Sequence, residues 1–544
     1  MGKTWILMVT CAVMLSGMEA FACTGLLVGK KASVDGSVMI SYAADSHTLY
    51  GELYRWPAAT WPKGAMLDII EWDKPLGQIP QVEQTYSVVG NMNEHQVAIT
   101  ESTFGGRPEL VDTTGIMDYG SLIYVTLQRS KTAREAIRIM TDLVKDYGYY
   151  SSGETFSIAD KNEAWVMEMI GKGPGNKGAV WVAIRIPDDC ISAHANQSRI
   201  QQIPFDDKEN CIYSPDVVSF AREKGYFSGR DKDFSFQKAY CPYDFSALRG
   251  CEARVWSFFR KYDKSMDQYM DLIKGDAMKK PMPLYVKPDR LLSVRDVQNG
   301  MRDHFEGTDL DMTKDAGAGP YKVPYRWRPM TFEVDGQEYT NERAIATQQT
   351  GFVIVPQMRN WLPDAVGGIL WFGVDDADMA VFTPIYCSVT ASPECYRVGN
   401  GDMMNFSWTS AFWIHNWVAN MAYGKYSYMI QDIRLVQQEL ENSYQQTIPA
   451  VDKAASELYA KNPAEAVKFL TWFSSTTADQ ATARWKKLGE YLLVKYMDGN
   501  VKKEENGHFK QNGYGLSEYP DFSGYDEDYY RSIVKSAGDK LKVK

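Results

Sequence analysis

The chain has 544 residues, of which 44% are hydrophobic and 13% aromatic, with 15 Trp and 33 Tyr. This composition excludes a disordered or low-complexity chain, and the length suffices for one large domain or for two or three smaller ones. The formal net charge of -10 is spread thinly and no basic stripe runs along the chain, so nucleic-acid binding has little support and small substrates are the expected partners.

Residues 1–22 have the pattern of an export signal that is removed from the mature protein. A cationic start at Lys3 precedes an apolar run over 5–18, and Ala20-Phe21-Ala22 matches the A-x-A cleavage pattern. Cleavage at this point predicts an exported protein, periplasmic or extracellular. After residue 22 no apolar run reaches the roughly 18 residues of a membrane span, so none is expected in the mature form.

Cleavage after Ala22 would make Cys23 the first residue of the mature chain. Its thiol and its free α-amine, whose unperturbed pKa is about 7.7 to 8.0, would then supply a nucleophile and a general base in one residue. Two alternatives stay open. Cys23 could be a lipoprotein anchor, although Ala20 and Phe21 replace the Leu and the small residue that lipidation favours. It could also form a disulfide.

The first half of the mature chain has the sequence patterns of β-strands. Residues 24–42 predict two strands joined by a turn at Asp35-Gly36. Further strands are predicted over 96–100, 155–158, 164–170 and 181–186, and apolar spacing predicts a helix over 131–144. Stacked antiparallel sheets covered by helices would satisfy this order.

The rest of the chain is predicted to contain an insertion and a helical end. Residues 205–290 indicate an elaborated insertion around one helix over 252–262, within a catalytic domain spanning 23–400. Extended segments follow at 352–356 and 369–384. A helical region is expected over 401–500, with helices over 426–444, 463–472 and 479–497, before a loosely packed polar tail over 501–544.

Six cysteines follow Cys23: Cys190, Cys211, Cys241, Cys251, Cys387 and Cys395. Their even number and the expected export permit disulfides. The local pairs Cys241–Cys251 and Cys387–Cys395 would close short loops and are preferred over the other pairings. Free buried thiols are equally compatible with the sequence.

Four segments are distinctive when taken together: CTGLLVGKKASVDGSVMISYAADSH from Cys23, VAITESTFGG from Val97, SIADKNEAWVMEMIG from Ser157 and IPDDCISAHANQSRI from Ile186. With later pieces from Val286 and Gln349, they resemble the cysteine N-terminal nucleophile (Ntn) dipeptidases of the dipeptidase A type, relatives of the choloylglycine and penicillin V acylases. The resemblance covers most of the mature chain. It implies an α+β fold, the αββα four-layer sandwich, and hydrolysis of dipeptides through a thioester acyl-enzyme.

The same resemblance implies four catalytic residues. Cys23 would be the nucleophile, and Asp45 would hold and tune its α-amine. Asn196 would donate its side-chain amide to the oxyanion, and Arg254 would lie near the nucleophile. Before Asp45 the acylases often carry an Arg-Asn pair, but Tyr42-Ala43-Ala44 stands here, so whether Tyr42 replaces the arginine or another residue supplies it is open.

Three neighbouring residues are candidates for substrate binding. Glu101, Ser102 and Thr103 follow a predicted strand, and the resemblance sets Thr103 near a second polar oxyanion residue of the acylases. Either Glu101 or Asp45 could bind the free ammonium of a dipeptide. The alternative for Glu101 is a structural ion pair with Arg107 or another cation.

Other chemistries find little support. The six histidines show neither an HExxH motif nor spacing for a metal site, and no Gly-x-Ser-x-Gly motif or phosphate-binding loop occurs, so no metal or cofactor is expected. Two other functions stay open: an Ntn amidase or acylase acting on N-acyl amino acids or bile-salt-like amides, and a lipid-anchored envelope binding protein. The sequence determines neither the preferred dipeptide side chains nor whether the protein forms a homo-oligomer.

Overall fold

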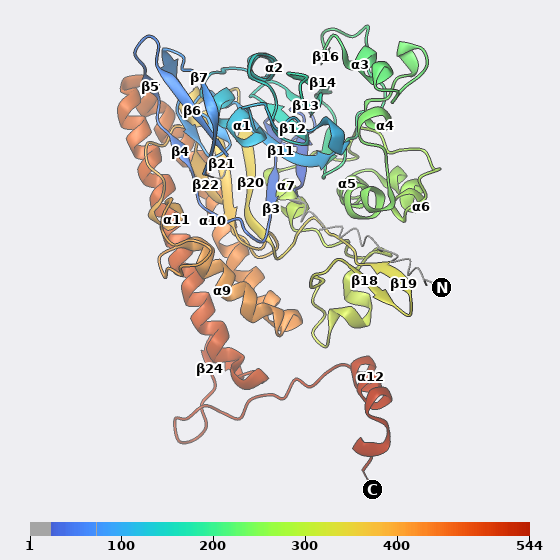
Figure 1. Ribbon diagram of the computed structural model, residues 1–544. Helices are drawn as coiled ribbons and strands as arrows, with labels where there is room; N and C mark the ends of the chain where they lie inside the picture. The colour runs from blue at the N-terminus through green and yellow to red at the C-terminus, as the bar shows by residue number, and fades with distance from the viewer. Residues whose placement is uncertain (1–22, 72, 544) are drawn as a thin grey trace, which may run out of the picture.

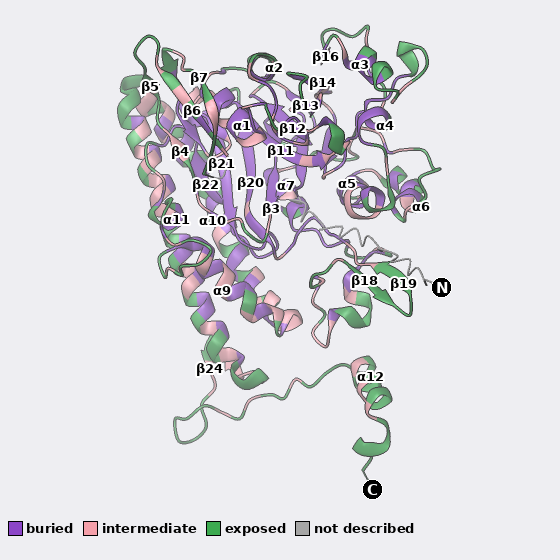
Figure 2. Cartoon of the chain, in the orientation of Figure 1, coloured by how far each residue is buried: buried purple, intermediate pink, exposed green. Residues whose placement is uncertain are grey.

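The computed structural model describes residues 23–71 and 73–543 (Figure 1). The predicted export signal lies outside the described residues. Helices and strands are both abundant along the chain, which confirms the predicted α+β class. Buried residues concentrate in the sheets and on the inner faces of the helices, whereas the chain end beyond β24 is mostly exposed (Figure 2).

Two eight-stranded antiparallel sheets form the centre of the fold. The first has the order β17-β15-β1-β2-β20-β21-β22, and β3 also pairs with β20. Its strands are β1 (Gly25–Val28), β2 (Val38–Ile40), β3 (Tyr42–Asp45), β15 (Ile191–His194), β17 (Tyr285–Val286), β20 (Thr350–Met358), β21 (Ile369–Val374) and β22 (Thr383–Tyr386). The predicted turn between β1 and β2 is present, with Gly36 at a φ of 86° that favours glycine.

The second sheet has the order β16-β14-β13-β12-β11-β10-β9-β4. Its strands are β4 (Arg55–Trp56), β9 (Val88–Val89), β10 (Met92–Asn93), β11 (Ala98–Gly105), β12 (Gly153–Ala159), β13 (Ala164–Gly171), β14 (Ala179–Ile186) and β16 (Cys211–Tyr213). The predicted strands over 155–158, 164–170 and 181–186 are therefore confirmed as β12, β13 and β14.

The two sheets face each other across a shared core. Val166 of β13 joins Leu27 and Ile40 of the first sheet in one buried cluster. Its neighbours Trp165 and Met167 belong to a different cluster on the opposite face. Because successive side chains of a strand point to opposite faces, β13 is apolar on both and needs a layer on each side.

Helices cover the outer face of each sheet. Helices α1 (Tyr119–Leu127) and α2 (Ala133–Tyr147) pack on the second sheet, and α2 confirms the helix predicted over 131–144. The helices that pack on the first sheet are α5 (Ala253–Arg260), α7 (Val294–Met301), α9 (Ala411–Tyr423), α10 (Tyr426–Lys461) and α11 (Pro463–Lys495). In Figure 1 the long helices α10 and α11 run side by side along one edge of the molecule.

The C-terminal helices differ from their predicted limits. The segment 463–497 was expected to hold two helices but forms the single helix α11. The residues between them, 473–478, include no Gly or Pro, and Ser474 and Ala478 are buried on the inner face of the helix. Packing along this face therefore stabilises a continuous helix through a polar stretch that, from sequence alone, indicated a break between two helices.

The segment 205–290 is joined to both sheets. It supplies β16 to the edge of the second sheet and β17 to the edge of the first, and the helix predicted over 252–262 is confirmed as α5. Its other helices are α3 (Val217–Glu223), α4 (Phe236–Tyr240) and α6 (Met270–Ile273), and a π-helix over Ala247–Glu252 leads into α5. The domain limits at residues 400 and 500 stay predictions.

The remaining elements are small hairpins and two short helices. The hairpins are β6 (Met66–Glu71) with β7 (Lys74–Pro80), β18 (Thr331–Val334) with β19 (Gln337–Thr340), and β23 (Glu504–Glu505) with β24 (His508–Phe509), and the strands β5 (Ala59–Thr60) and β8 (Gln84–Thr85) pair on either side of the β6–β7 hairpin in the chain. The helices are α8 (Asp364–Gly367) and α12 (Glu527–Ala537). Among the described residues no helix is long and apolar enough to cross a membrane.

The preferred disulfides are wrong. All seven described cysteines are free thiols. The Cys387 thiol donates to the Asp364 carbonyl at 3.3 Å, whereas Cys395 hydrogen-bonds the α11 side chains Asp479 and Thr482. Short sequence separation brings two thiols near each other only if their side chains point the same way, and here packing on different elements directs them apart.

Candidate active site

Cys23 lies at the start of β1, where the two sheets approach each other. Its neighbour Thr24 pairs with Ala43 in β3, and the Cys23 side chain is buried at 3% exposure. The thiol lines a cavity of ≈ 200 Å³. Sγ lies 3.6 Å from Tyr42 Oη and 3.6 Å from Glu101 Oε1. The first sheet therefore supplies the thiol and the second supplies a carboxylate beside it.

The pairing of β1 with β15 brings Asn196 to the same place. Gly25 pairs with His194 in an antiparallel register. Cys23, two residues before Gly25, therefore lies opposite Asn196, two residues after His194. A side chain at Gly25 would prevent this approach, because a Cβ there would lie 2.6 Å from His194 Nε2. The short CTG and SAHAN segments thus meet through the register of one strand pair.

Burial governs the charge of the Cys23 thiol. Desolvation raises its pKa well above the usual value, and the negative charges of Glu101 and Asp45 raise it further. Two hydrogen bonds oppose this effect: the backbone N–H of Asp45 donates to sulfur, and the thiol donates to the Tyr42 oxygen. The thiol is accordingly neutral at pH 7 in the described protein and needs a base to become nucleophilic.

Asp45 is buried beside Cys23 and tied to an arginine far along the chain. Arg343 Nη2 donates to Asp45 Oδ2 at 2.5 Å, and Thr350 Oγ1 donates to Oδ1 at 2.7 Å. Burial raises the pKa of Asp45, and the Arg343 charge lowers it in part. Sequence reasoning missed Arg343; the only signal was an isolated cation before the uncharged stretch 344–358.

Arg254 links the backbone of Cys23 to Asn196. Its Nη1 donates to Cys23 O at 2.8 Å and to Thr24 Oγ1 at 2.9 Å, while Nη2 donates to Asn196 Oδ1 at 2.9 Å. The amide nitrogen of Asn196 in turn donates to Thr103 O at 2.7 Å. The structure therefore brings Cys23, Asp45, Asn196 and Arg254 together, and it fixes which way the Asn196 amide points.

The three residues of β11 point in different directions. Glu101 faces the cavity, where Tyr42 Oη donates to its Oε1. Ser102 lies on the opposite face and bonds His194 Nδ1 at 2.6 Å, while Thr103 Oγ1 donates to Glu154 at 2.6 Å, behind the cavity. The alternative ion pair of Glu101 does not form, because Arg107 donates to Ala239 O.

The walls of the cavity are mainly aromatic. Trp56 stacks on Tyr124 with ring centroids 5.1 Å apart, and Phe352 stacks on Phe372 at 5.9 Å. Ligand pockets usually measure about 300 to 1,000 Å³, so the ≈ 200 Å³ beside Cys23 suits only a short substrate. The site combines a thiol, a carboxylate and apolar walls.

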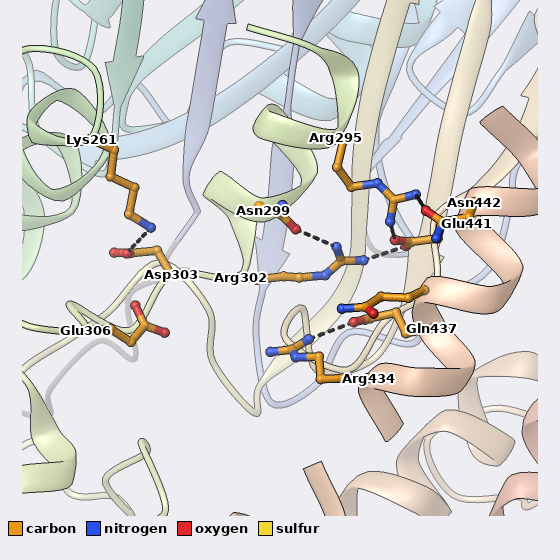
Figure 3. Close-up of a pocket in the computed structure, with 11 residues that line it drawn as sticks. Lys261, Arg295, Asn299, Arg302, Asp303, Glu306, Arg434, Gln437, Glu441 and Asn442 are labelled. Atoms are coloured by element: carbon orange, nitrogen blue, oxygen red, sulfur yellow. Dashed lines mark hydrogen bonds and ion pairs between the residues drawn. The ribbon is translucent and has the colours of Figure 1, made fainter. Parts of the chain in front are cut away.

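A second cavity, of ≈ 490 Å³, lies between α7 and α10 (Figure 3). Arg302 Nη2 donates to Glu441 Oε1 at 2.5 Å, Arg295 bonds the other oxygen of Glu441, and Lys261 pairs with Asp303. These cations already have carboxylate partners, and no thiol or hydroxyl nucleophile is among the described residues that line it. This cavity therefore belongs to the contact that holds α10 against the sheet.

Metal ligands do not gather elsewhere in the described chain. Within residues 23–71 and 73–543, no group of three or more His, Cys, Asp or Glu side chains is arranged to hold a metal ion. His194 and His415 are both buried, and burial lowers the pKa of each to about 3, so both are neutral.

Several known proteins are similar in sequence to this chain over most of its length. The sequence model of peptidase family C69 matches residues 22–55 and 50–439. A "Probable dipeptidase" of Latilactobacillus sakei is 27% identical over 477 residues, covering 84% of this chain and 92% of that protein. A "Probable dipeptidase" of Salmonella dublin is 27% identical over 403 residues, with 69% and 83% covered. "Dipeptidase A" of Lactobacillus helveticus is 24% identical over 453 residues, with 79% and 86% covered.

Proposed function

The chain belongs to peptidase family C69, and on this premise we propose that it is an exported cysteine-type dipeptidase whose mature N-terminal residue, Cys23, is the nucleophile. One observation carries the proposal: the Cys23 thiol lines a small cavity and lies 3.6 Å from the carboxylate of Glu101. The dipeptidase names of the similar proteins agree with a cavity of this size.

The reaction begins with the thiol and the α-amine of Cys23. Because burial keeps the thiol protonated, the α-amine takes its proton, and the thiolate attacks the scissile carbonyl. The Asn196 amide and a backbone N–H donate to the oxyanion. The carbon–nitrogen bond then breaks, the leaving amine takes the proton back, and a thioester remains. Water, deprotonated by the α-amine of Cys23, then hydrolyses the thioester and releases the N-terminal residue of the dipeptide.

Arg254 and Asp45 support this chemistry without taking part in bond making. Arg254 holds the Cys23 carbonyl and the Asn196 oxygen, which keeps nucleophile and oxyanion donor in one arrangement. The charge of Asp45 is matched by Arg343. Of the two carboxylates near the thiol, Glu101 is therefore the better partner for the α-ammonium of a dipeptide.

The fold and the location are part of the same proposal. We assign the facing sheets with helices on both outer faces to the αββα sandwich of the Ntn hydrolases, which uses an N-terminal nucleophile. The pattern of residues 1–22 supports export to the periplasm or the extracellular space. A free N-terminal Cys23 requires this processing.

Intact mass and N-terminal sequencing of the exported protein, with dipeptide hydrolysis by wild type and Cys23→Ser, test the proposal. We expect a free Cys23 terminus and loss of hydrolysis in the variant. A lipidated terminus would support the envelope binding protein instead, because acylation removes the base. Preference for N-acyl amino acids over dipeptides would support the amidase or acylase.

A further inference from the structure

Glu154 lies directly behind Glu101 on the neighbouring strand. In the antiparallel pair β11–β12, Glu101 is opposite Phe156 and Thr103 is opposite Glu154. Glu101 and Glu154 are therefore diagonal neighbours on the same face of the sheet, within reach for long side chains. Only Glu101 lines the cavity; Glu154 is completely buried behind it. We call these two residues the carboxyl pair.

Each member of the carboxyl pair has one oxygen that accepts a hydrogen bond from a hydroxyl group. Tyr42 donates to Glu101 Oε1, and Thr103 Oγ1 donates to Glu154 Oε1 at 2.6 Å. In the described part of the chain, the Oε2 atoms of both residues lack any other donor. Since the two carboxyl groups are diagonal neighbours on one face of the sheet, one proton shared between these oxygens would give each of them a partner.

The surroundings favour a single negative charge on the carboxyl pair. No Lys or Arg of the described chain forms an ion pair with either residue, although both are buried. Desolvation raises the pKa of Glu154 well above its usual range, and the charge of Glu101 raises it further. Burial raises the pKa of Glu101 as well, but that of Glu154 is raised further, so the first proton that the pair takes up goes to Glu154.

The ionisable side chains that face the carboxyl pair are acids, and the proposed processing would add one base, the α-amine of Cys23. They are Cys23, Tyr42, Asp45, Tyr119 and Tyr149. Asp45 is neutralised by Arg343, and burial raises the pKa of the thiol and of the phenols, so these groups stay neutral near pH 7. Among the described residues that line the cavity, Glu101 and Glu52 are the carboxylates without an ion pair; Glu52 accepts from the Tyr54 hydroxyl and the Gly399 N–H, and only Glu101 contacts the thiol.

We propose that Glu154 is a positioning residue that holds one proton against Glu101, so that Glu101 presents a single, oriented negative charge to the α-ammonium of the substrate. This inference rests on the proposed dipeptidase function and deepens it. The carboxyl pair makes a free amino group a requirement of the substrate, because an N-acyl group would leave the charge of Glu101 buried without a partner.

Two substitutions of Glu154 separate this role from a purely structural one. In Glu154→Gln the amide can donate to Glu101 Oε2 and accept from Thr103, so KM for a dipeptide should stay within about twofold of wild type. Glu154→Leu removes the donor, and KM should rise about tenfold or more while kcat changes little. A des-amino analogue of the same dipeptide should show no such rise. Glu338→Gln, on the exposed strand β19, is the matched control.

Infrared spectroscopy of the free protein supplies a readout that does not depend on activity. The carbonyl band of a protonated carboxylic acid should be lost in Glu154→Gln and kept in Glu338→Gln. The alkaline limb of the dipeptide KM should also move to higher pH in Glu154→Gln, since an amide has no proton to lose. An unchanged band in Glu154→Gln, or a wild-type KM in a folded Glu154→Leu, would overturn the inference.

The two proposals fail in different ways. If Cys23→Ser cleaves dipeptides as wild type does, the nucleophile is wrong, while the infrared comparison still decides whether Glu154 holds the proton. If hydrolysis needs Cys23 but both Glu154 variants bind dipeptides equally well, the dipeptidase proposal stands and the role of the carboxyl pair is refuted.

Discussion

Arg254 donates a hydrogen bond of 2.8 Å to the backbone carbonyl of Cys23, across 231 positions of sequence. The same guanidinium group reaches Asn196, so one buried cation joins Cys23 to Asn196, the proposed nucleophile and oxyanion donor. Burial lowers the pKa of Arg254 to about 10, which still leaves it charged at neutral pH. The site is therefore held together from α5, outside the two strands that carry the reacting groups.

Replacing Arg254 by Lys should separate these two anchors. Lysine keeps the charge but lacks the planar fork that contacts Cys23 and Asn196 together, so we expect kcat for a dipeptide to fall about 100-fold. Steady-state kinetics measure the loss. Arg260→Lys on the same helix is the control, because Arg260 bonds the carbonyl of Glu306 away from the cavity. Equal kcat values in the two variants would contradict the role.

Activity should fall in acid with the protonation of the Cys23 α-amine. Burial raises the pKa of the thiol, so the thiol stays protonated over this range and the amine carries the acid limb. Below the amine pKa of about 7.7 to 8.0, kcat/KM should drop about tenfold per pH unit. A pH profile of dipeptide hydrolysis tests this, and a flat rate from about pH 5 to 8 would count against the amine as base.

His415 should destabilise the protein in acid. It packs against Trp485, and burial lowers its pKa from 6.5 to about 3. The folded state keeps His415 neutral while the unfolded chain binds a proton, so the free energy of unfolding should fall as pH drops below 6.5, by about 2 kcal/mol at about pH 5. In urea denaturation, the free energy of unfolding of His415→Leu should no longer show this decrease in acid. If the variant keeps the pH dependence of wild type, His415 is not its cause.

The small cavity should limit the length of the substrate. Tripeptides should have kcat/KM values about tenfold or more below those of matched dipeptides, because the ≈ 200 Å³ beside Cys23 has no room for a third residue. Trp56→Ala removes one ring of the stack with Tyr124, which enlarges the cavity, and should reduce the difference in kcat/KM between dipeptides and tripeptides. Competition between a dipeptide and a matched tripeptide measures this ratio of kcat/KM values. Equal cleavage of both lengths by wild type would exclude this cavity as the length filter.

All seven cysteines from Cys23 to Cys395 should titrate as thiols. A thiol assay of the mature protein, unfolded without reductant, is expected to find seven free thiols. The same assay after alkylation of the unfolded protein should find none. A count of five or fewer would mean that export introduces a disulfide.

Much of the fold and part of the site could be predicted from sequence. The mainly apolar segment 164–170 predicts the strand that is confirmed as β13, and helical spacing over 131–144 predicts α2. Cys23 was found as the residue after a cleavage motif, and Asn196 and Arg254 through resemblance. These signals are local, because each depends only on the order of neighbouring residues.

Tertiary structure alone decided which distant groups meet. Arg343 reaches Asp45 across 298 positions and Glu154 reaches Glu101 through the register of β11 and β12, and neither contact follows from spacing. Packing likewise continued α11 through a polar stretch and kept Cys387 apart from Cys395. The sequence by itself determined the faces of the elements and pointed to Cys23 as the proposed nucleophile. The charges around that nucleophile depend on strand register and on the closure of two sheets, which are long-range properties set by burial of the whole core.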